Sequence, residues 1–319
     1  MSGRNERDQR SWSPEELEQL DNLAVLLDRD YNEEEQEGRI PFVLGYAQDA
    51  VSSLPRGGYW YKDPATRQPE VGWRVRPSRL RKAGLELEEL VGWAVLFDGE
   101  STGSRYDYKE GRELDGRDAG YIAFQHVYSN QANLDYHNMQ GIINGINSTL
   151  LPYNQQIIAP HIKPLPYDAD SRITTGGALV ALTKTASTDG KIRKYLHTAV
   201  IGDVRIYRDG GLGRLTLLTK DDREDDPRTG RSVLSKQLGA ASHIEISSGN
   251  YRKTEVYPGD SVLICSRNIH SKLSSSDLHG LIQDVMPHQA AQDIVEAATL
   301  LRSRGPVSAL VIDVALYKK

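Results

Sequence analysis

The residues that could do chemistry cluster where predicted strands end. Ser266, Arg267 and Asn268 directly follow the apolar run 262–265, which predicts a strand buried on both faces. Asp98 closes a second apolar run in the same way. Polar side chains at such positions lie where a scaffold usually presents chemistry. A guanidinium keeps its charge near neutral pH, so Arg267 is suited to bind a carboxylate or a phosphoryl group.

Other reactive residue types in the chain predict structural roles. Cys265 is the single cysteine, so it cannot form an intramolecular disulfide, and its place inside an apolar run favours a buried, unreactive thiol. The eight histidines show no metal-binding spacing. The serines that precede Asp277 are typical of a helix cap.

Composition limits the partners and the compartment. The formal net charge is −5, and no basic stripe with interleaved aromatic residues is present, so we expect no nucleic-acid partner. No apolar run is long enough to span a bilayer, and the N-terminus has no apolar signal region, so we expect no membrane association. Together with the single cysteine, these features favour a cytoplasmic protein.

Charge also divides the chain into two parts. Residues 1–40 contain 5 Lys and Arg against 12 Asp and Glu. Ser13 and Glu16 form a capping box that begins an amphipathic helix within this stretch. We therefore expect an acidic N-terminal extension over residues 1–40 with one helix, followed by one domain over residues 41–319.

The order of apolar runs and turn signals predicts an α+β fold. Strands and helices fall into separate blocks, which favours a four-layer α-β-β-α sandwich that includes a parallel βαβ sheet. Residues 100–120 are polar and predict an exposed loop. Predicted strands cover residues 41–50, 91–99, 177–182, 194–207, 215–218, 256–265 and 309–315, and predicted helices lie within 121–151, from about 278, and over 289–302.

Five motifs in order resemble the protein phosphatase 2C family of metal-dependent serine/threonine phosphatases. The most similar is Ala199 to Arg205, which resembles the family's Ala-Asn-Val-Gly-Asp-Ser-Arg hairpin. The others are Gly176 to Ala181, Leu218 to Asp222, Leu234 to Gly239, and the Ser-Asp-Gly strand at Ser266 to Asn268. The resemblance covers about residues 41–314 and implies that family's sandwich fold.

The family holds two divalent metals with carboxylates, and this chain departs from that pattern. Asp98 and Gly99 match the Asp-Gly motif, but Arg267 and Asn268 replace the Asp and Gly of Ser-Asp-Gly. The late Asp-Asn motif falls at Val307 and Ser308, and the best register of the first motif places Arg81 at an acidic position; a less favoured register starts at Arg56, with Asp63 as a substitute. Asp203 corresponds to an Asp that supports an extra metal in some members.

This pattern leads to a structural hypothesis about Arg267. We expect its guanidinium to lie within salt-bridge distance of Asp98 and to replace the charge of a metal ion, which it would repel. The alternative is that Arg267 points to solvent and that Asp98 is a turn residue. Because the chain lacks the family's full set of carboxylates, we expect Asp98, Gly99 and Asp203 to be vestigial metal positions. We expect no bound metal and no catalytic residue.

Three functions remain open. The first is a catalytically inactive phosphatase-like domain, a pseudophosphatase, that acts as a regulatory or scaffold module and binds a protein such as a kinase or a phosphoprotein. The second is a divergent phosphatase that uses Mg²⁺ or Mn²⁺ with a reduced ligand set drawn from Asp98, the Gly99 carbonyl, Asp203 and Asp63. The third is a module in which Arg267 and Arg205 bind a phosphoryl group without cleaving it. Fold alone does not decide among them.

Overall fold

We analysed a computed structural model of the chain. It describes residues 42–48, 61–62, 69–70, 87–101, 105–109, 111–130, 134–155, 161–164, 172–186, 192–211, 213–227, 230, 232–301 and 307–314. The predictions for the extension 1–40, for Asp63 and for Arg81 lie outside these residues.

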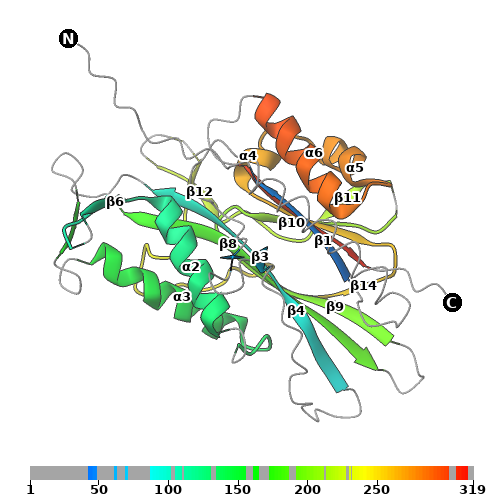
Figure 1. The fold of residues 1–319 in the computed structure, drawn as a ribbon, viewed down its shortest axis with the longest axis horizontal. Coiled ribbons are helices and arrows are strands. Elements are labelled where there is room, and N and C mark those ends of the chain that lie inside the picture. Colours follow the sequence, from blue (N-terminus) through cyan, green and yellow to red (C-terminus); the bar gives the residue numbers. More distant parts are fainter. Residues whose placement is uncertain are drawn as a thin grey trace.

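Two antiparallel sheets form the centre of the molecule (Figure 1). The four-stranded sheet has the order β14 (Tyr251–Val256), β9 (Ile192–Ile201), β8 (Ile173–Ala186) and β4 (Leu87–Ser101). The five-stranded sheet has the order β1 (Phe42–Gln48), β16 (Ser308–Val314), β15 (Ser261–Cys265), β10 (Arg205–Asp209) and β11 (Leu215–Leu217).

Helices cover the outer face of each sheet (Figure 1). On the four-stranded sheet lie α2 (Gly116–Asn130) and α3 (Met139–Asn154). On the five-stranded sheet lie α5 (Ser275–Ile282) and α6 (Pro287–Leu300), next to the short α4 (Arg267–His270). The predicted α-β-β-α sandwich is therefore confirmed. None of the helices in the described part of the chain is both long and apolar enough to cross a membrane.

The alternation of side chains along the strands explains the layers. In β4, Trp93 and Phe97 belong to the core under α2 and α3, whereas Ala94 and Leu96 belong to the core between the two sheets. This period of two is what a strand buried on both faces requires. Asp98 continues the series of Ala94 and Leu96 at the end of the same strand.

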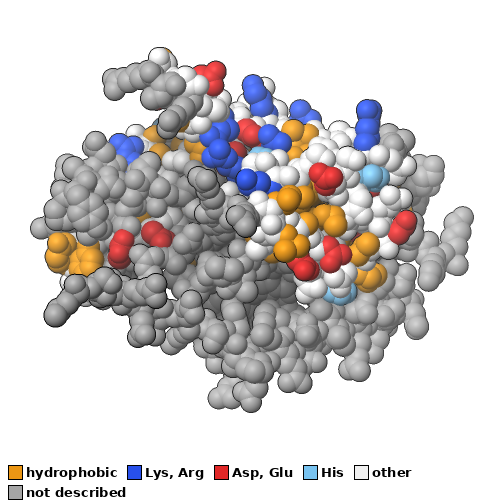
Figure 2. Space-filling model, turned by 90° about the horizontal axis from the view of Figure 1, so that it is seen from above, with side chains coloured by type: hydrophobic (Ala, Val, Ile, Leu, Met, Phe, Trp, Pro, Cys, Tyr) orange, Lys and Arg blue, Asp and Glu red, His pale blue; other side chains and the backbone are white. Residues whose placement is uncertain are grey.

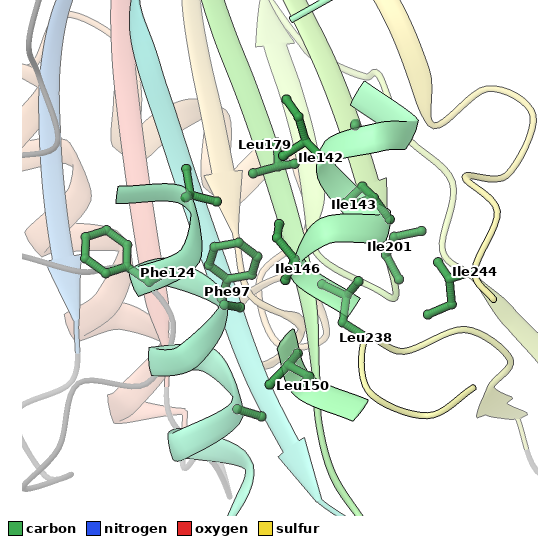
Figure 3. Close-up of a cluster of buried hydrophobic side chains, with 14 of the residues drawn as sticks. Phe97, Phe124, Ile142, Ile143, Ile146, Leu150, Leu179, Ile201, Leu238 and Ile244 are labelled. Atoms are coloured by element: carbon green, nitrogen blue, oxygen red, sulfur yellow. The ribbon is translucent and has the colours of Figure 1, made fainter. Parts of the chain in front are cut away.

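Phe97 lies in the core under α2 and α3 (Figure 3). Phe97 lies opposite Gly177 in the β4–β8 ladder. A Cβ at Gly177 would lie 2.4 Å from Cδ1 of the Phe97 ring, closer than two carbon atoms can come. Glycine at this position thus makes room for the ring, which packs among isoleucine and leucine side chains from α3 and β8.

Two predictions about the elements were wrong. The predicted parallel βαβ sheet is wrong: no parallel pair occurs among the described strands, and each named ladder is antiparallel. Residues 100–120 are not an exposed loop, because Arg105, Asp107 and Leu114 are buried there. They lie in a small sheet of β6 (Arg112–Leu114), β5 (Arg105–Asp107) and β7 (Ile162–Pro164), and α2 begins at Gly116.

Two short hairpins stand outside the large sheets. One pairs β2 (Tyr61–Lys62) with β3 (Pro69–Glu70). The other pairs β12 (Arg223–Asp225) with β13 (Ser232–Leu234) and follows the turn that contains Asp203 by 20 residues. This second hairpin contributes to the site described next.

Candidate functional site

A tight turn after β9 positions the central carboxylate. Gly202 adopts a positive φ of 92°, and a Cβ on it would lie 3.0 Å from the Cα of Gly176. Both the backbone angle and the crowding favour glycine. Asp222 braces the turn: its Oδ2 accepts the Gly202 N–H at 3.0 Å, and its own N–H donates to the Gly202 carbonyl at 2.8 Å. Asp203 follows at the start of the next segment and is therefore held in place.

The carboxylate of Asp203 is buried between two arginines. Its side chain is 2% exposed, and its Oδ2 lies 2.6 Å from Nη1 of Arg223 and 3.5 Å from Nε of Arg267. The Asp203 carbonyl lies 2.8 Å from Nε2 of His270. A buried carboxylate is stable only when it is paired and hydrogen-bonded, and here guanidinium groups supply the positive charge.

Arg223 is fixed by more contacts than Arg267. Besides its bond to Asp203, its Nε donates to the Ser232 hydroxyl at 3.1 Å and its Nη2 donates to the Ser232 carbonyl at 2.7 Å. Its side chain is 15% exposed, whereas that of Arg267 is 44% exposed. Arg223 thus connects the β12–β13 hairpin to the Asp203 turn, and Arg267 lies at the solvent side.

A second ion pair lies beside the first. Arg205 donates from Nε and Nη2 to the two carboxylate oxygens of Asp221, each at 2.8 Å, and from Nη1 to the Tyr207 hydroxyl at 3.1 Å. The hydrogen bonds with Asp221 raise the pKa of Arg205 further above its ordinary value. Burial favours a higher pKa for Asp221, but the bonds and charge of Arg205 outweigh it, so the pKa of Asp221 is lowered. Both partners therefore stay charged.

Asp222 differs from its neighbour because it faces inward. Burial raises its pKa above the ordinary value, although a hydrogen bond from the Ser247 hydroxyl and the bond from Gly202 act in the opposite direction. Its oxygens are committed to Ser247 and to the turn. Asp222 therefore acts as a brace for the backbone and is not positioned as a catalytic carboxylate.

The segments at the other predicted positions come together at the end of β15. Ser266 and Ser308 exchange hydrogen bonds: the Ser266 N–H donates to the Ser308 carbonyl at 3.0 Å, and the Ser308 N–H donates to the Ser266 hydroxyl at 3.1 Å. Val307 is buried next to this contact. Arg267 and Asn268 begin α4, one residue beyond Ser266.

The partner predicted for Arg267 was wrong. Its ion pair in the structure is with Asp203, from the turn after β9, and not with Asp98. Asp98 is buried at the end of β4, next to Gly99. Asp98 and the Asp203 turn both belong to the side of the four-stranded sheet, so the packing of the two sheets against each other decides which carboxylate Arg267 reaches, and the sequence alone does not specify that packing.

Arg223 is the main site residue that sequence reasoning missed. It follows Asp221 and Asp222 directly, just after the motif Leu218 to Asp222. A cation adjacent to two acidic residues in a segment that resembles a family motif was the available signal. Its partner Asp203 lies 20 residues earlier in the chain.

These donors do not fit a divalent metal ion. Mg²⁺ and Mn²⁺ require several oxygen ligands that converge without a competing cation, whereas the Asp203 carboxylate is engaged by two guanidinium groups. A further cation there would meet positive charge at close range. Within the part of the chain that the structure describes, no group of three or more His, Cys, Asp or Glu side chains is arranged to hold a metal.

The surface around this cluster is basic. Figure 2 looks onto the end of the molecule where α4 and β12 lie in Figure 1, and it shows Lys and Arg side chains gathered there with acidic side chains among them. The cluster pairs three arginines with two carboxylates. It therefore carries an excess of positive charge that an anionic group could approach.

Comparison with solved structures confirms the fold. PppA, described as a key regulatory component of T6SS in Pseudomonas aeruginosa, matches with a TM-score of 0.51 at 16% identity over 85% of this chain and 99% of that chain. The catalytic domain of the serine/threonine phosphatase PstP, in complex with 2 manganese ions, matches with a TM-score of 0.52 at 17% identity over 86% and 100%. The serine/threonine phosphatase Stp1 from Staphylococcus aureus matches with a TM-score of 0.51 at 13% identity, over 76% of this chain and 93% of that chain.

At these identities the likeness shows the fold alone. The chain has the fold of the protein phosphatase 2C family, and the resemblance seen in its sequence motifs is confirmed at that level. No protein-family model matches the chain, and a search of curated proteins found no match.

Proposed function

We propose that this chain is a pseudophosphatase: a protein phosphatase 2C-like domain that does not hydrolyse phosphoesters and acts as a regulatory or scaffold module for a protein partner. One observation carries the proposal. Arg267, which the sequence resemblance places at the acidic position of the Ser-Asp-Gly motif, engages the Asp203 carboxylate together with Arg223. The positive charge that metals supply in a two-metal centre is here supplied by side chains.

The nature of the partner follows from the same surface. An excess of arginine suits an acidic or phosphorylated protein, such as a kinase or a phosphoprotein. One protein with this fold, PppA, is described as a regulatory component, which supports a regulatory role for the fold. We place the chain in the cytoplasm, and we keep the division into an acidic extension over residues 1–40 and a domain over residues 41–319.

Calorimetric titration with Mn²⁺ and Mg²⁺, together with a phosphatase assay on the same sample, tests the proposal. We expect neither binding nor turnover. Binding together with turnover that is lost in Asp98→Ala would overturn the proposal and would favour a divergent phosphatase that uses Asp98, the Gly99 carbonyl and Asp203. The Asp313→Asn variant is a matched control, because it removes a carboxylate that bonds Ser261 on β15, outside the cluster.

A phosphoryl-binding module is a second candidate. The exposure of Arg267 favours it, because the guanidinium contacts Asp203 through Nε while 44% of the side chain is exposed. Arg205 is less suited to bind a phosphoryl group than the sequence suggested, because its guanidinium already donates to both carboxylate oxygens of Asp221. Titration with a phosphoserine peptide and its unphosphorylated form tests this second candidate: a preference for the phosphorylated peptide that is lost in Arg267→Ala supports phosphoryl binding, and equal binding of the two peptides contradicts it.

A further inference from the structure

On the β12–β13 hairpin, the Ser232 hydroxyl contacts Arg223, the arginine that connects this hairpin to the Asp203 turn. Ser232 is exposed on β13, and its oxygen accepts from Nε of Arg223 at 3.1 Å. The same guanidinium bonds Asp203 at 2.6 Å. We propose that Ser232 is a phosphorylation site, and that its phosphoryl group takes Arg223 from Asp203 and releases the hairpin from the Asp203 turn. This inference goes beyond the proposed function and does not depend on it.

The hairpin can open to present Ser232 to a kinase. It consists of two strands of 3 residues that pair with each other and form a sheet of their own. An isolated two-stranded hairpin is marginally stable. In the sequence, Arg228 and Arg231 precede the serine, and such basic flanks suit a kinase whose peptide site is acidic. Exposure, weak pairing and flanking charge together make Ser232 an accessible acceptor.

The transfer itself is ordinary serine phosphorylation. Oγ of Ser232 forms a bond to the γ-phosphorus of ATP while the bond from that phosphorus to the β-phosphate oxygen breaks. ADP leaves, and the hydroxyl proton passes to the catalytic base of the protein kinase. The product carries a charge near −2 at pH 7 and three strong acceptor oxygens.

The arginines around Asp203 make the exchange possible. A phosphate dianion is a stronger guanidinium acceptor than the hydroxyl it replaces. When Arg223 turns to the phosphate, Asp203 keeps Arg267, whose Nε lies 3.5 Å from the same oxygen. The buried carboxylate is therefore not left unpaired, which would be the costly outcome. Because Arg223 and Arg267 both contact the Asp203 carboxylate, Arg223 can leave while Arg267 remains.

Asp225 adds a second effect. It lies directly opposite Ser232 in the β12–β13 ladder. Like charges directly opposite each other destabilise a strand pair, so phosphoserine at this position would weaken the ladder while it attracts Arg223. Both effects loosen the hairpin.

The first experiment asks whether the modification occurs. The full chain is isolated from its own cells and studied by intact mass and phosphopeptide mapping. We expect phosphate on the peptide that contains Ser232, lost in Ser232→Ala and retained in Ser276→Ala, a change at an exposed serine of α5. Absence of phosphate at Ser232, or its presence on Thr229 instead, would overturn the proposal.

The second experiment asks whether Arg223 receives the phosphate. Phosphoserine is incorporated genetically at position 232 or, as a control, at position 276, and each phosphate is titrated by ³¹P NMR. Ser276 lies in the first turn of α5, so the second ionisation at 276 is expected at or slightly below the ordinary pH of about 6. That at 232 is expected at least about 0.5 pH units lower than at 276, because the Arg223 guanidinium contacts the phosphate directly and favours the dianion. The difference should disappear in Arg223→Gln. Equal ionisation at 232 and 276 would refute the exchange even if Arg223→Gln fails to fold.

Discussion

Asp203 has two arginine partners that differ in what they contribute. Arg223 is nearly buried and bonds both the carboxylate and the hairpin, whereas Arg267 is half-exposed and makes a longer contact. Removing Arg223 would leave the buried carboxylate only its longer contact with a half-exposed guanidinium and would also break both bonds to Ser232, whereas an exposed pair contributes little. The two guanidinium groups are chemically alike, but Arg223 contributes more than Arg267 to the free energy of unfolding.

This difference gives a prediction at the scale of residues. Arg223→Ala should lower the free energy of unfolding by about 2–4 kcal/mol, and Arg267→Ala by less than about 1 kcal/mol. Urea denaturation of the two variants at equal pH and salt checks the order. Equal losses would show that Asp203 depends on both arginines to the same degree.

Sequence reasoning succeeded at residues whose role depends on near neighbours. The Ser274–Asp277 cap of α5 was predicted and is a complete capping box, because all its atoms belong to residues within one turn. The pairing of Arg267 failed because Asp98 and Asp203 are both far from it in the sequence, and only the packing of the two sheets decides which of them it reaches. A helix cap is formed by residues close together in the sequence, whereas the site is formed by residues that are far apart in the sequence and meet only in the folded chain.

At the scale of elements, short strands were the hardest to foresee. The buried residues Arg105 and Asp107 lie in a strand of 3 residues, and charged side chains there do not show the alternation that indicates a strand. The prediction of a parallel βαβ sheet was also wrong, since a run buried on both faces fits parallel and antiparallel sheets alike. Long helices were found because several turns repeat their pattern.

A glycine in β8 gives the prediction for this scale. Gly177→Ala places a methyl group 2.4 Å from the Phe97 ring, so strand and ring must separate. Overpacking of this kind should cost about 1–3 kcal/mol of unfolding free energy. Gly280→Ala is the matched control, because nothing lies within 4 Å of its Cβ position in α5, and it should stabilise by about 0.5–1 kcal/mol. Thermal unfolding of both variants measures the contrast, and a stable Gly177→Ala protein would show that Phe97 can repack.

At the scale of the whole molecule, one carboxylate joins all four strands of a sheet. Glu88 on β4 accepts the Thr183 hydroxyl of β8 at 2.7 Å and Nζ of Lys253 of β14 at 2.8 Å, and it lies 2.6 Å from Nε2 of His197 on β9. Burial acts to raise its pKa, but these partners outweigh burial and lower the pKa from 4.5 to about 2. The ionised carboxylate is therefore tied to the folded state.

The sign of the pH dependence follows from this shift. A carboxyl group whose pKa is lower in the folded protein than in the unfolded chain stabilises the folded state at pH values above the unfolded pKa. This contribution is lost as the pH falls through the folded pKa. Unfolding free energy should therefore fall by up to about 3 kcal/mol between pH 4.5 and pH 2. Glu88→Gln should be less stable at pH 7 and show a shallower decline in this window, measured by denaturation at a series of pH values. An unchanged slope would assign the acid sensitivity to other groups.

Cys265 gives the chain a built-in reporter of its own opening. The thiol is fully buried at the end of β15, and burial raises its pKa far above the ordinary value. A thiol reagent therefore meets the sulfur only in molecules in which the five-stranded sheet has opened. Because the chain has 1 cysteine, each modified molecule counts one such opening, and the labelling rate follows the opening of the sheet next to the arginine cluster without any engineered probe.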